Sequence, residues 1–525
     1  MTAEQKGRIL YNFLDEALLG IEDAKGLRSR ITLPGLLARL SCGESTSLTA
    51  LQAHQQHPMH AFLVQLAAIS LERSGESEIA HDEGAWRELL LVAAARDGGG
   101  PEAFALVVED LSKPAFMQPP VPEGTLAGFK SEPGETLNLI DTLSTSKNHD
   151  VKARRVVAAQ PEHWMYSLIS LQTSQGVYGG GNYGIARMNS GFGNRPCVAL
   201  SEDMSLTSRF AVEVAIALQV RSAISCRGFA ATRSIGFLWC EPWDGTASLS
   251  FEKLDPYFIE ICRRIRLGSS SDHTTLSVFR TGSDVPRVVG TSRGNTGDLW
   301  TPVSASEGTA LSLSGSGFTY ARVRDLLFSD GDWSPGAVGD PRYHPAAKYW
   351  LGQALVRGKG GTEGYHERWV PIPPKARSFF AKPESRQAAG KMAQSWVDAA
   401  ANVRLKVLKP ALLTLIQAAP AKLKFDDDRA DAFLRRFEFA VDQIFFPRLF
   451  GTLELPPDES LAGFQRELFA IAKRELQTAC GSVPLSAIRK HRSIAVAERV
   501  LDGAARKHLA LAFPRREEEH QGVAS

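Results

Sequence analysis

The last third of the chain carries the pattern that most limits how it can fold. Apolar residues recur there at helical spacing, in segments separated by short connections that contain proline. The segments are 385–408, 410–419, 427–448, 458–479 and 485–511, and the connections hold Pro410, Pro420, Pro456, Pro457 and Pro484. Asp427, Ser460 and Ser486 lie near expected helix starts, where their side chains suit capping. Long amphipathic helices with short connections favour an antiparallel bundle of the four-helix type over 383–512.

Residues 1–382 differ in character from this bundle. Helical spacing predicts helices over 33–72, 85–96 and 101–112. From about 120 to 380 the chain is rich in Gly, Ser, Thr, Asp and Pro, with short strand-like runs at 234–239 and 275–279. We therefore expect an α+β protein. A large, loop-rich, mixed α/β domain over 1–382 precedes the bundle, and a disordered polar tail follows it over 513–525.

Composition limits the class of protein. A chain of 525 residues that is 43% hydrophobic and 22% charged is typical of a soluble globular protein with more than one core. Its 60 basic and 58 acidic residues give a net charge of +2, which excludes a uniformly basic nucleic-acid coat but allows local basic patches. The sequence has no apolar run of about 18 residues and no apolar signal-peptide core, so we expect a cytoplasmic protein without membrane contact. Its six cysteines form no Cys-x-x-Cys pair, which argues against a cysteine zinc site.

A glycine-rich stretch over 175–193 is the strongest candidate for a functional loop. It holds seven glycines, and Tyr178, Asn182 and Arg187 lie among them. The successive residues Gly179, Gly180 and Gly181 lack a Cβ, so the backbone can approach a partner closely, and a nearby arginine and tyrosines suit nucleic acid. No Gly-Lys-Ser/Thr follows, which excludes a Walker A motif, and no βαβ frame with a downstream acid surrounds the stretch. A purely structural loop is the alternative.

Two other segments carry basic residues that suit a phosphate backbone. Segment 146–155 is a polar loop that would grip a phosphate or a base, or would be a solvated surface loop. Its residues of interest are Lys147, Asn148, His149 and Lys152. The pattern of segment 256–267 predicts a helix. Its basic face would lie near phosphates, or its arginines would form local ion pairs on the surface. Its basic residues are Arg263, Arg264 and Arg266.

A second glycine-rich segment, 356–368, has basic flanks. Its central residues are Lys359, Gly360, Gly361, Thr362 and Glu363. Such a loop suits insertion against a duplex, and a flexible hairpin connection is the alternative.

Catalytic and metal-binding patterns are weak throughout the chain. His54, His57 and His60 fall at i, i+3 and i+6, whereas a helical metal site needs i and i+4 with a further ligand, so a helix face is favoured. The acids at 426–428 lie where a helix is expected to begin, and there they favour the helix dipole. No Ser-His-Asp, Cys-His or paired-carboxylate set stands out. We therefore expect no enzyme activity, no catalytic residue, no metal and no cofactor.

The order of these elements resembles a known family. The run Lys113-Pro114-Ala115-Phe116-Met117-Gln118-Pro119 comes first, then the basic segment, then Tyr178-Gly179-Gly180-Gly181, and then the bundle. This order resembles the large subunit of the type I-E CRISPR surveillance complex Cascade (the CasA family). In that family a Pro-Phe-Met-Gln segment precedes a loop and an aromatic-Gly-Gly-Gly segment follows, although here Ala115 is inserted after the proline. The resemblance spans most of the chain, with its local matches within 100–200.

The resemblance also implies a function. The family's large subunit checks the protospacer-adjacent motif on duplex DNA, while pairing with the guide RNA reads the remaining sequence. Its glycine loop lies against the minor groove, which implies DNA contacts at Tyr178, at Gly179, Gly180 and Gly181, and at Asn182, with Arg187 beside them. By position, 147–155 corresponds to the loop that docks near the guide RNA's 5′ handle. Residues 359–363 correspond to the wedge that starts strand separation, but the family's wedge glutamine is missing here.

The implied partners are guide RNA (crRNA), double-stranded target DNA, the other Cascade subunits (backbone, small and handle-binding) and a recruited helicase-nuclease. The bundle would contact the displaced strand of the R-loop and neighbouring subunits. One alternative is the same subunit in a complex that recruits a transposition factor or carries a fused nuclease. Another is a metal-dependent nuclease that uses Asn148, His149 and the acids at 426–428. A third is a structural scaffold without DNA contact.

Overall fold

The computed structural model describes residues 8–76, 78–131, 137–141, 159–188, 195–230, 233–270, 275–289, 293–328, 331–358 and 361–514. The chain divides into two compact units. Unit 1 comprises Met1–Phe318 and Asp332–Pro371, and unit 2 comprises Thr319–Gly331 and Ile372–Ser525. The sequence-based boundary at 382/383 lies a short way further along the chain. The mixed architecture, with several small sheets followed by a helical C-terminal region, confirms the expected α+β class.

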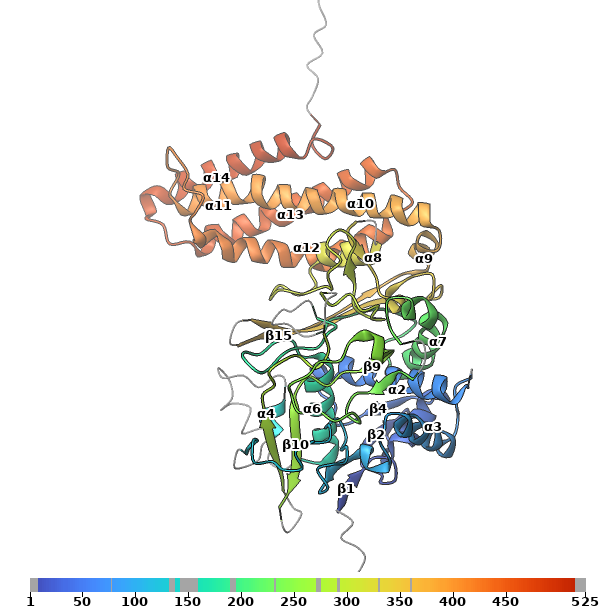
Figure 1. The fold of residues 1–525 in the computed structure, drawn as a ribbon. Helices are drawn as coiled ribbons and strands as arrows, with labels where there is room; N and C mark the ends of the chain where they lie inside the picture. The colour runs from blue at the N-terminus through green and yellow to red at the C-terminus, as the bar shows by residue number, and fades with distance from the viewer. Residues whose placement is uncertain are drawn as a thin grey trace, which may run out of the picture. The chain divides into compact units, whose positions relative to one another are not determined.

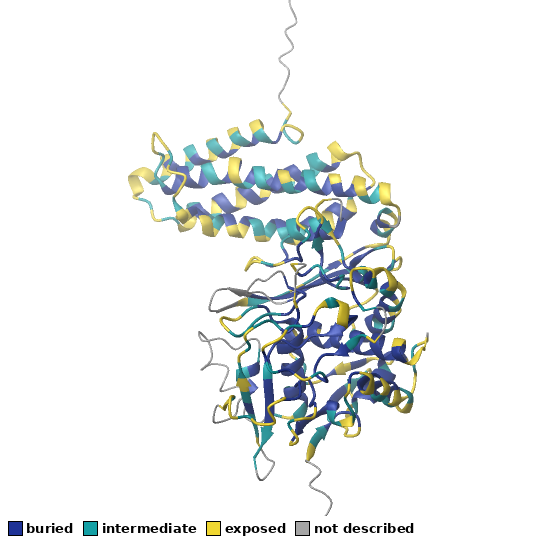
Figure 2. Cartoon of the chain, in the orientation of Figure 1, coloured by how far each residue is buried: buried dark blue, intermediate teal, exposed yellow. Residues whose placement is uncertain are grey.

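Two long helices form the centre of unit 1. In Figure 2, α2 and α6 are buried along most of their length, so their apolar residues need no amphipathic pattern. The helices of unit 1 are α1 Leu33–Ser41, α2 Gln56–Ser74, α3 Glu83–Arg96, α4 Leu137–Ile140, α6 Pro161–Ser174 and α7 Leu206–Ser225. Its 3₁₀ turns are η1 Ala53–Gln55, η2 Pro101–Phe104, η3 Phe251–Lys253 and η4 Ala337–Gly339.

The strands of unit 1 form small sheets around these helices. Three sheets have three strands each, in the orders β3-β2-β4, β10-β11-β6 and β15-β14-β7, and β1-β5, β8-β9 and β12-β13 are pairs. All of these pairings are antiparallel except β8 with β9. The strands are β1 Ile9–Asn12, β2 Leu19–Asp23, β3 Arg28–Ile31, β4 Thr46–Leu48, β5 Ala105–Val108, β6 Lys130–Ser131, β7 Cys197–Ser201, β8 Ile235–Phe237, β9 Leu254–Ile259, β10 Arg264–Ser269, β11 Leu276–Thr281, β12 Val303–Ser304, β13 Trp333–Ser334, β14 Tyr349–Gly358 and β15 Gly361–Pro371.

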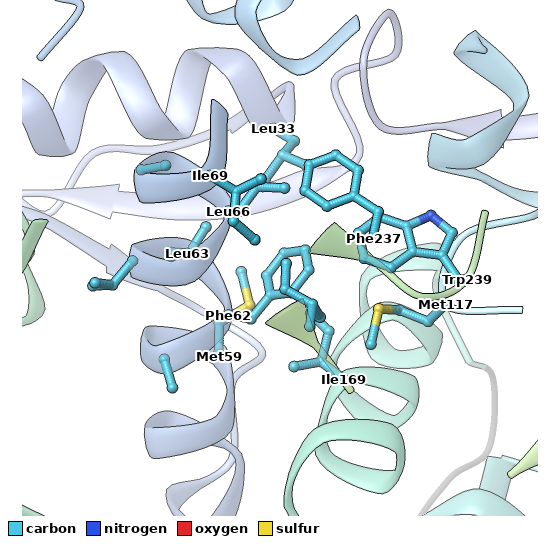
Figure 3. Close-up of a cluster of buried hydrophobic side chains, with 14 of the residues drawn as sticks. Leu33, Met59, Phe62, Leu63, Leu66, Ile69, Met117, Ile169, Phe237 and Trp239 are labelled. Atoms are coloured by element: carbon cyan, nitrogen blue, oxygen red, sulfur yellow. The ribbon is translucent and has the colours of Figure 1, made fainter. Parts of the chain in front are cut away.

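Aromatic side chains fill the core between α2, α6 and β8. Figure 3 shows Phe62, Met117, Ile169, Phe237 and Trp239 among the buried side chains of this cluster. The rings of Phe237 and Trp239 stack with centroids 4.6 Å apart. Offset ring packing of this kind adds to the free energy that burial of the apolar surface supplies.

The Phe116-Met117-Gln118 run, which carries part of the family resemblance, belongs to this core. The ring centroid of Phe116 lies 5.7 Å from that of Phe62. Gln118 Nε2 donates to Leu106 O at 2.8 Å, and Gln118 Oε1 accepts from Leu267 N at 2.6 Å. This buried amide therefore joins β5 to β10, so the run stabilises the fold rather than forming a surface.

Unit 2 is helical in its described part, as the sequence predicts. It consists of α8 Tyr320–Phe328, α9 Pro374–Ala381, α10 Pro383–Asn402, the π-helical segment η5 Val403–Leu408, α11 Lys409–Ile416, η6 Asp428–Ala430, α12 Asp431–Gly451, α13 Pro457–Ser482 and α14 Ala487–His508. Figure 1 shows α10 to α14 side by side in a bundle. The ring of Trp396 on α10 stacks on Phe464 of α13, with centroids 3.9 Å apart and planes at 8°.

Some helix ends differ from those expected. Pro410 does not separate two helices, because the wider π-helical turn before it accommodates the proline, which lacks an N–H. Asp427 caps η6 through its bond with Arg429 N, as expected. Ser460 lies inside α13, where its hydroxyl contacts Thr452 Oγ1 at 2.9 Å. Ser486 occupies the N-cap position of α14 without a side-chain capping bond.

Three predicted helices of unit 1 are wrong in whole or in part. The region 33–72 is interrupted after α1, where Gly43 has φ +69° and β4 follows. Region 101–112 forms η2 and β5, because the buried run of β5 pairs with β1. Segment 256–267 forms parts of β9 and β10, since β9 pairs with β8 and β10 pairs with β11. The helix over 85–96 and the strand-like runs at 234–239 and 275–279 are confirmed in α3, β8 and β11.

The stacked aromatic pair predicts a test of the bundle. Trp396 is 1% exposed, so Trp396→Ala should lower the free energy of unfolding by about 3–5 kcal/mol through lost burial and an empty cavity. Phe439, also in the bundle, is 69% exposed, so Phe439→Ala should change it by less than about 0.5 kcal/mol. Urea and thermal unfolding of the full chain measure both changes. Equal losses for the two variants would contradict this packing.

Candidate nucleic-acid interface

The described part of the glycine-rich stretch, residues 175–188, follows α6 directly and is called the glycine loop below. A tight turn forms its tip, in which Tyr178 N donates to Asn182 O at 2.9 Å and Asn182 N donates to Gly179 O at 3.1 Å. Gly179 has φ +97° and Gly181 has φ +73°. Residues with a side chain rarely adopt these backbone angles, so glycine is required at both positions for the turn to close.

The tip of the glycine loop is exposed backbone. Gly179 and Gly180 are exposed, and 47% of Tyr178 is exposed. In the described part of the chain, no atom lies within 4 Å of the position that a Cβ on Gly180 would take. The fold itself therefore does not require glycine at 180.

The base of the glycine loop is closed by backbone contact. Ile185 N donates to Gln175 O at 3.1 Å. A Cβ on Gly184 would lie 2.7 Å from the carbonyl carbon of Gly176. Gly184 is therefore a packing requirement at the point where the two limbs meet, in contrast to Gly180 at the tip.

Arg263 holds both limbs of the loop from beneath. Its side chain is buried and follows β9 in sequence. Arg263 Nη2 donates to Gly176 O at 3.0 Å on the first limb, and Arg263 Nη1 donates to Tyr183 O on the second. Because a guanidinium presents several donors in a fixed plane, one side chain can fix the separation of the two limbs.

Glu260 anchors the second limb through its charge. Glu260 accepts from Ala186 N and Arg187 N, each at 3.2 Å, and from Arg187 Nη1 at 3.2 Å. Burial raises the pKa of Glu260, an effect that Arg187 and these backbone bonds oppose. Arg187 also lies over the ring of Phe258 at 4.0 Å.

Arg187 therefore occupies a different place from the one that the sequence suggested. Its side chain is 2% exposed, so it presents no surface to DNA in this structure. Its cationic group instead neutralises Glu260 and contacts Asp298, which lies 3.8 Å from Arg187 Nε. We correct its assignment from DNA contact to support of the loop.

The end of β11 lies beside the tip. Ser283 N donates to Gly181 O at 3.0 Å, and Tyr183 Oη donates to Asp284 O at 2.8 Å. In the same sheet Arg280 on β11 is paired with Lys130 on β6, and both residues are exposed. These two cations on neighbouring strands place positive charge on the sheet that adjoins the loop.

The arginines of segment 256–267 are structural. Arg266 Nη2 donates to Val108 O at 3.0 Å and its Nη1 donates to Lys113 O at 3.0 Å. Burial lowers the pKa of Arg266 to about 10, which acidic Asp110 opposes. Arg264 is paired with Glu123 at 3.6 Å. Both interpretations of this segment are therefore wrong: it forms strands, Arg263 and Arg266 donate to backbone carbonyls, and Arg264 pairs with an acid distant in sequence.

The second glycine-rich segment is a hairpin in its described part. In the β14–β15 ladder Gly358 is paired with Gly361, and Arg357 with Thr362. Gly361 and Thr362 therefore lie on a paired strand. Glu363 lies on β15 near Gly315. Lys359 and Gly360, together with Lys147, Asn148, His149 and Lys152, lie outside the described residues.

Three of the residues considered as metal ligands, His54, His60 and Asp427, have other partners. His60 Nε2 lies 2.7 Å from Glu213 Oε2, and His54 Nε2 lies 3.0 Å from Asp141 Oδ1. Burial lowers the pKa of His57 and of His60, so both are neutral near pH 7. Asp427 accepts from Arg429 Nε at 2.8 Å. Across the described ranges, no group of three or more His, Cys, Asp or Glu side chains is arranged to hold a metal ion.

No helix in the described part of the chain is both long and apolar enough to cross a membrane.

Sequence reasoning missed the groups that support the loop, namely Glu260 and Asp298, and misplaced Arg263. Glu260 is the one charged residue in the otherwise apolar run 256–262. A lone charge in a buried strand-like run is a sequence signal for a paired, structural role, because burial without a partner is strongly unfavourable.

Two glycines of the loop predict opposite outcomes on substitution. Gly184→Ala should lower the free energy of unfolding by about 1–3 kcal/mol, because its Cβ collides with the first limb. Gly180→Ala should change it by less than about 0.5 kcal/mol, because its Cβ enters open space. Thermal unfolding and amide hydrogen exchange over 175–188 measure both. Loss of stability in Gly180→Ala with none in Gly184→Ala would contradict the loop geometry.

The buried acid Asp298 predicts a pH effect. Burial would raise the pKa of Asp298, but Arg195 and Arg187 lower it to about 2. A carboxyl whose pKa falls on folding stabilises the fold above its unfolded pKa of about 3.9, and that contribution is lost as the pH falls towards 2. The difference in Tm between the wild type and Asp298→Asn should therefore be constant above about pH 5 and shrink below about pH 4. A difference that does not change between pH 5 and pH 2 would contradict the pairing.

Comparison with solved structures places this geometry in a known fold. Cse1 from Thermobifida fusca matches with a TM-score of 0.63 at 13% identity, covering 97% of this chain and 100% of that chain. Cse1 from Acidimicrobium ferrooxidans matches with a TM-score of 0.62 at 13% identity, covering 96% and 99%. A chain described as a CRISPR RNA-guided surveillance complex matches with a TM-score of 0.61 at 10% identity, covering 95% and 100%.

Sequence comparison alone does not find this relationship. No protein-family model matches the sequence, and no curated protein matches it. The likeness of structure nevertheless extends over nearly the full length of both chains. It agrees with the resemblance that the order of motifs suggested. The chain has the fold of the Cse1 (CasA) subunits of type I-E CRISPR Cascade.

Proposed function

We propose that this chain is the large subunit of an RNA-guided CRISPR Cascade complex and recognises the protospacer-adjacent motif on double-stranded DNA through its glycine loop. The observation that carries the proposal is the exposed tip at Gly179 and Gly180, fixed from beneath by buried side chains. The likeness to Cse1 structures along the whole chain supports the role of a Cascade subunit. Guide RNA and the other Cascade subunits are the partners that this role requires.

The geometry of the tip suits the minor groove. That groove is narrow, so backbone without side chains enters it more easily than a helix does. Its pattern of donors and acceptors is degenerate, so a loop of this kind would accept several related motifs. Tyr178 and Asn182 flank the glycines and supply a ring and an amide at the edge of the contact. Arg280 and Lys130 suit the phosphates beside it, which would make DNA binding fall steeply with salt.

Duplex opening and partner recruitment complete the proposed role. Residues 359–363 would form the wedge that inserts beneath the motif, and strands β14 and β15 flank this segment on both sides. Segment 147–155 would dock near the guide RNA's 5′ handle. The open R-loop would then recruit a separate helicase-nuclease in the cytoplasm, and this chain would cut nothing itself.

A metal-dependent nuclease is the main alternative from another class. Asp427, one of its proposed ligands, is engaged by Arg429 and by Gln417 Nε2 at 3.3 Å, which favours a capping role. Incubation of the purified chain with DNA and Mg²⁺ or Mn²⁺ should give no cleavage. Cleavage that depends on metal and is lost in His149→Ala would contradict our proposal. The neighbouring genes would distinguish a recruited helicase-nuclease from a transposition factor or a fused nuclease.

Gly180→Ala is the sharpest test of motif recognition, because the free fold tolerates the added methyl group. In the assembled complex it should weaken binding to motif-containing duplex by about tenfold, since the methyl group would hold the backbone away from the base edges. Gly128→Ala is the matched control, because a Cβ there also meets no atom within 4 Å in the described part of the chain. Binding to randomised-motif duplex libraries measures both. Equal losses on motif-containing and motif-free duplexes would count against the proposal.

A further inference from the structure

A row of buried charged side chains connects the glycine loop to the start of β7, in the β7–β14–β15 sheet. It consists of Glu260, Arg187, Asp298 and Arg195 and is called the charge relay below. Arg187 Nη1 lies 3.2 Å from Glu260 Oε1, and Arg187 Nε lies 3.8 Å from Asp298 Oδ1. Arg195 Nε donates to Asp298 Oδ2 at 2.7 Å, and its Nη2 also contacts that carboxylate. All four side chains are 3% exposed or less.

The two halves of the charge relay belong to different parts of unit 1. Glu260 and Arg187 hold the second limb of the glycine loop. Arg195 leads directly into β7, and Asp298 begins a segment that runs beside it. In that segment Thr301 Oγ1 donates to Asp298 Oδ2 at 2.7 Å and to Pro196 O at 3.2 Å, and Trp300 O accepts from Val198 N at 2.9 Å.

Strand β7 connects this second half to the wedge-like hairpin. In the β7–β14 ladder Cys197 is paired with Gln353 and Ser201 with Tyr349. Strand β14 in turn is paired with β15 along the hairpin. Asp298 therefore lies between the loop proposed to read the motif and the sheet whose hairpin is proposed to open the duplex.

The contact between the two halves is the longest in the charge relay. Within each half a carboxylate and a guanidinium are within hydrogen-bond distance, whereas 3.8 Å separates Arg187 Nε from Asp298 Oδ1. At this distance in a buried site the attraction is mainly Coulombic and depends on the full charge of Asp298. An uncharged amide at 298 would keep the shape of the side chain but lose most of the attraction between the halves.

We propose that Asp298 is a positioning residue that holds the glycine loop in a fixed place relative to the β7–β14–β15 sheet, so that motif reading and duplex opening are coupled. It touches no DNA itself and acts through Arg187 and Arg195. The coupling part of this inference rests on the function proposed above. The positioning part concerns the chain alone and has its own readout.

The test compares Asp298→Asn with a matched control, Asp97→Asn. Asp97 accepts from Arg73 Nη1 at 2.7 Å and Nη2 at 2.9 Å, and its side chain is 1% exposed. It is thus another buried acid paired with arginine in unit 1, outside the charge relay. Both variants should lower Tm, and this shared loss measures general destabilisation.

Amide hydrogen exchange in the free chain measures positioning. Asp298→Asn should speed exchange over 175–188 and 349–371 beyond the change in Asp97→Asn. In the assembled complex, Asp298→Asn should reduce by about fivefold both the preference for motif-containing duplex and the rate of opening per bound complex. On a target with unpaired bases next to the motif, Asp298→Asn should regain the opening rate of the wild type but not its motif preference.

The outcomes separate the two proposals. Exchange in Asp298→Asn that matches the Asp97→Asn control would overturn the positioning role. Faster exchange with unchanged motif preference would support positioning and overturn motif reading by the glycine loop. Faster exchange with reduced motif preference but an unchanged opening rate would overturn the coupling. Faster exchange, a reduced motif preference and a slower opening rate would together support the whole inference, provided that the target with unpaired bases restores the opening rate.

Discussion

Arg263 and Glu260 lie beneath the glycine loop, and the exposed tip depends on their hydrogen bonds. A loop rich in glycine loses more conformational freedom on ordering than any other, so it needs strong bonds to hold one shape. Arg263 bonds a carbonyl on each limb, and Glu260 bonds consecutive backbone amides on one limb. These charge-assisted bonds are strengthened by burial, which allows the tip itself to stay free of side chains.

Buried side chains also bond to backbone groups elsewhere in unit 1, where they join segments of different sheets. Gln172 Nε2 donates to Met117 O at 3.0 Å and to Arg263 O at 3.0 Å, while its Oε1 accepts from the backbone N of Cys262 and of Arg263. Gln118 joins β5 to β10 in a similar way. Buried side-chain amides thus connect segments distant in sequence and carry the support from the core to the glycine loop. The resemblance to CasA therefore includes a structural run as well as a candidate DNA-contacting loop.

The sequence predicted those features that local chemistry determines. Helical spacing predicted the bundle. The run of glycines predicted the tip, because glycine adopts backbone conformations that other residues rarely adopt. Segment 256–267 was assigned to a helix because its isoleucines fit either period, and the strand pairing that decides between them is not local. Arg187 was assigned to DNA because its partners, Glu260 and Asp298, are brought to it only by the tertiary fold. The glycine-rich motif therefore predicted the loop but not the buried residues, Glu260 and Asp298, that hold it.

The proposed function requires the glycine tip to touch the motif in duplex DNA. A photoreactive phenylalanine analogue in place of Tyr178 tests it most directly, because that side chain is half exposed at the edge of the tip. Irradiation of the assembled, guide-loaded complex on motif-containing duplex should give a cross-link at the motif base pairs, and a duplex without the motif should give little. Cross-links that fall elsewhere on the DNA, or that form equally on both duplexes, would contradict contact between the glycine tip and the motif.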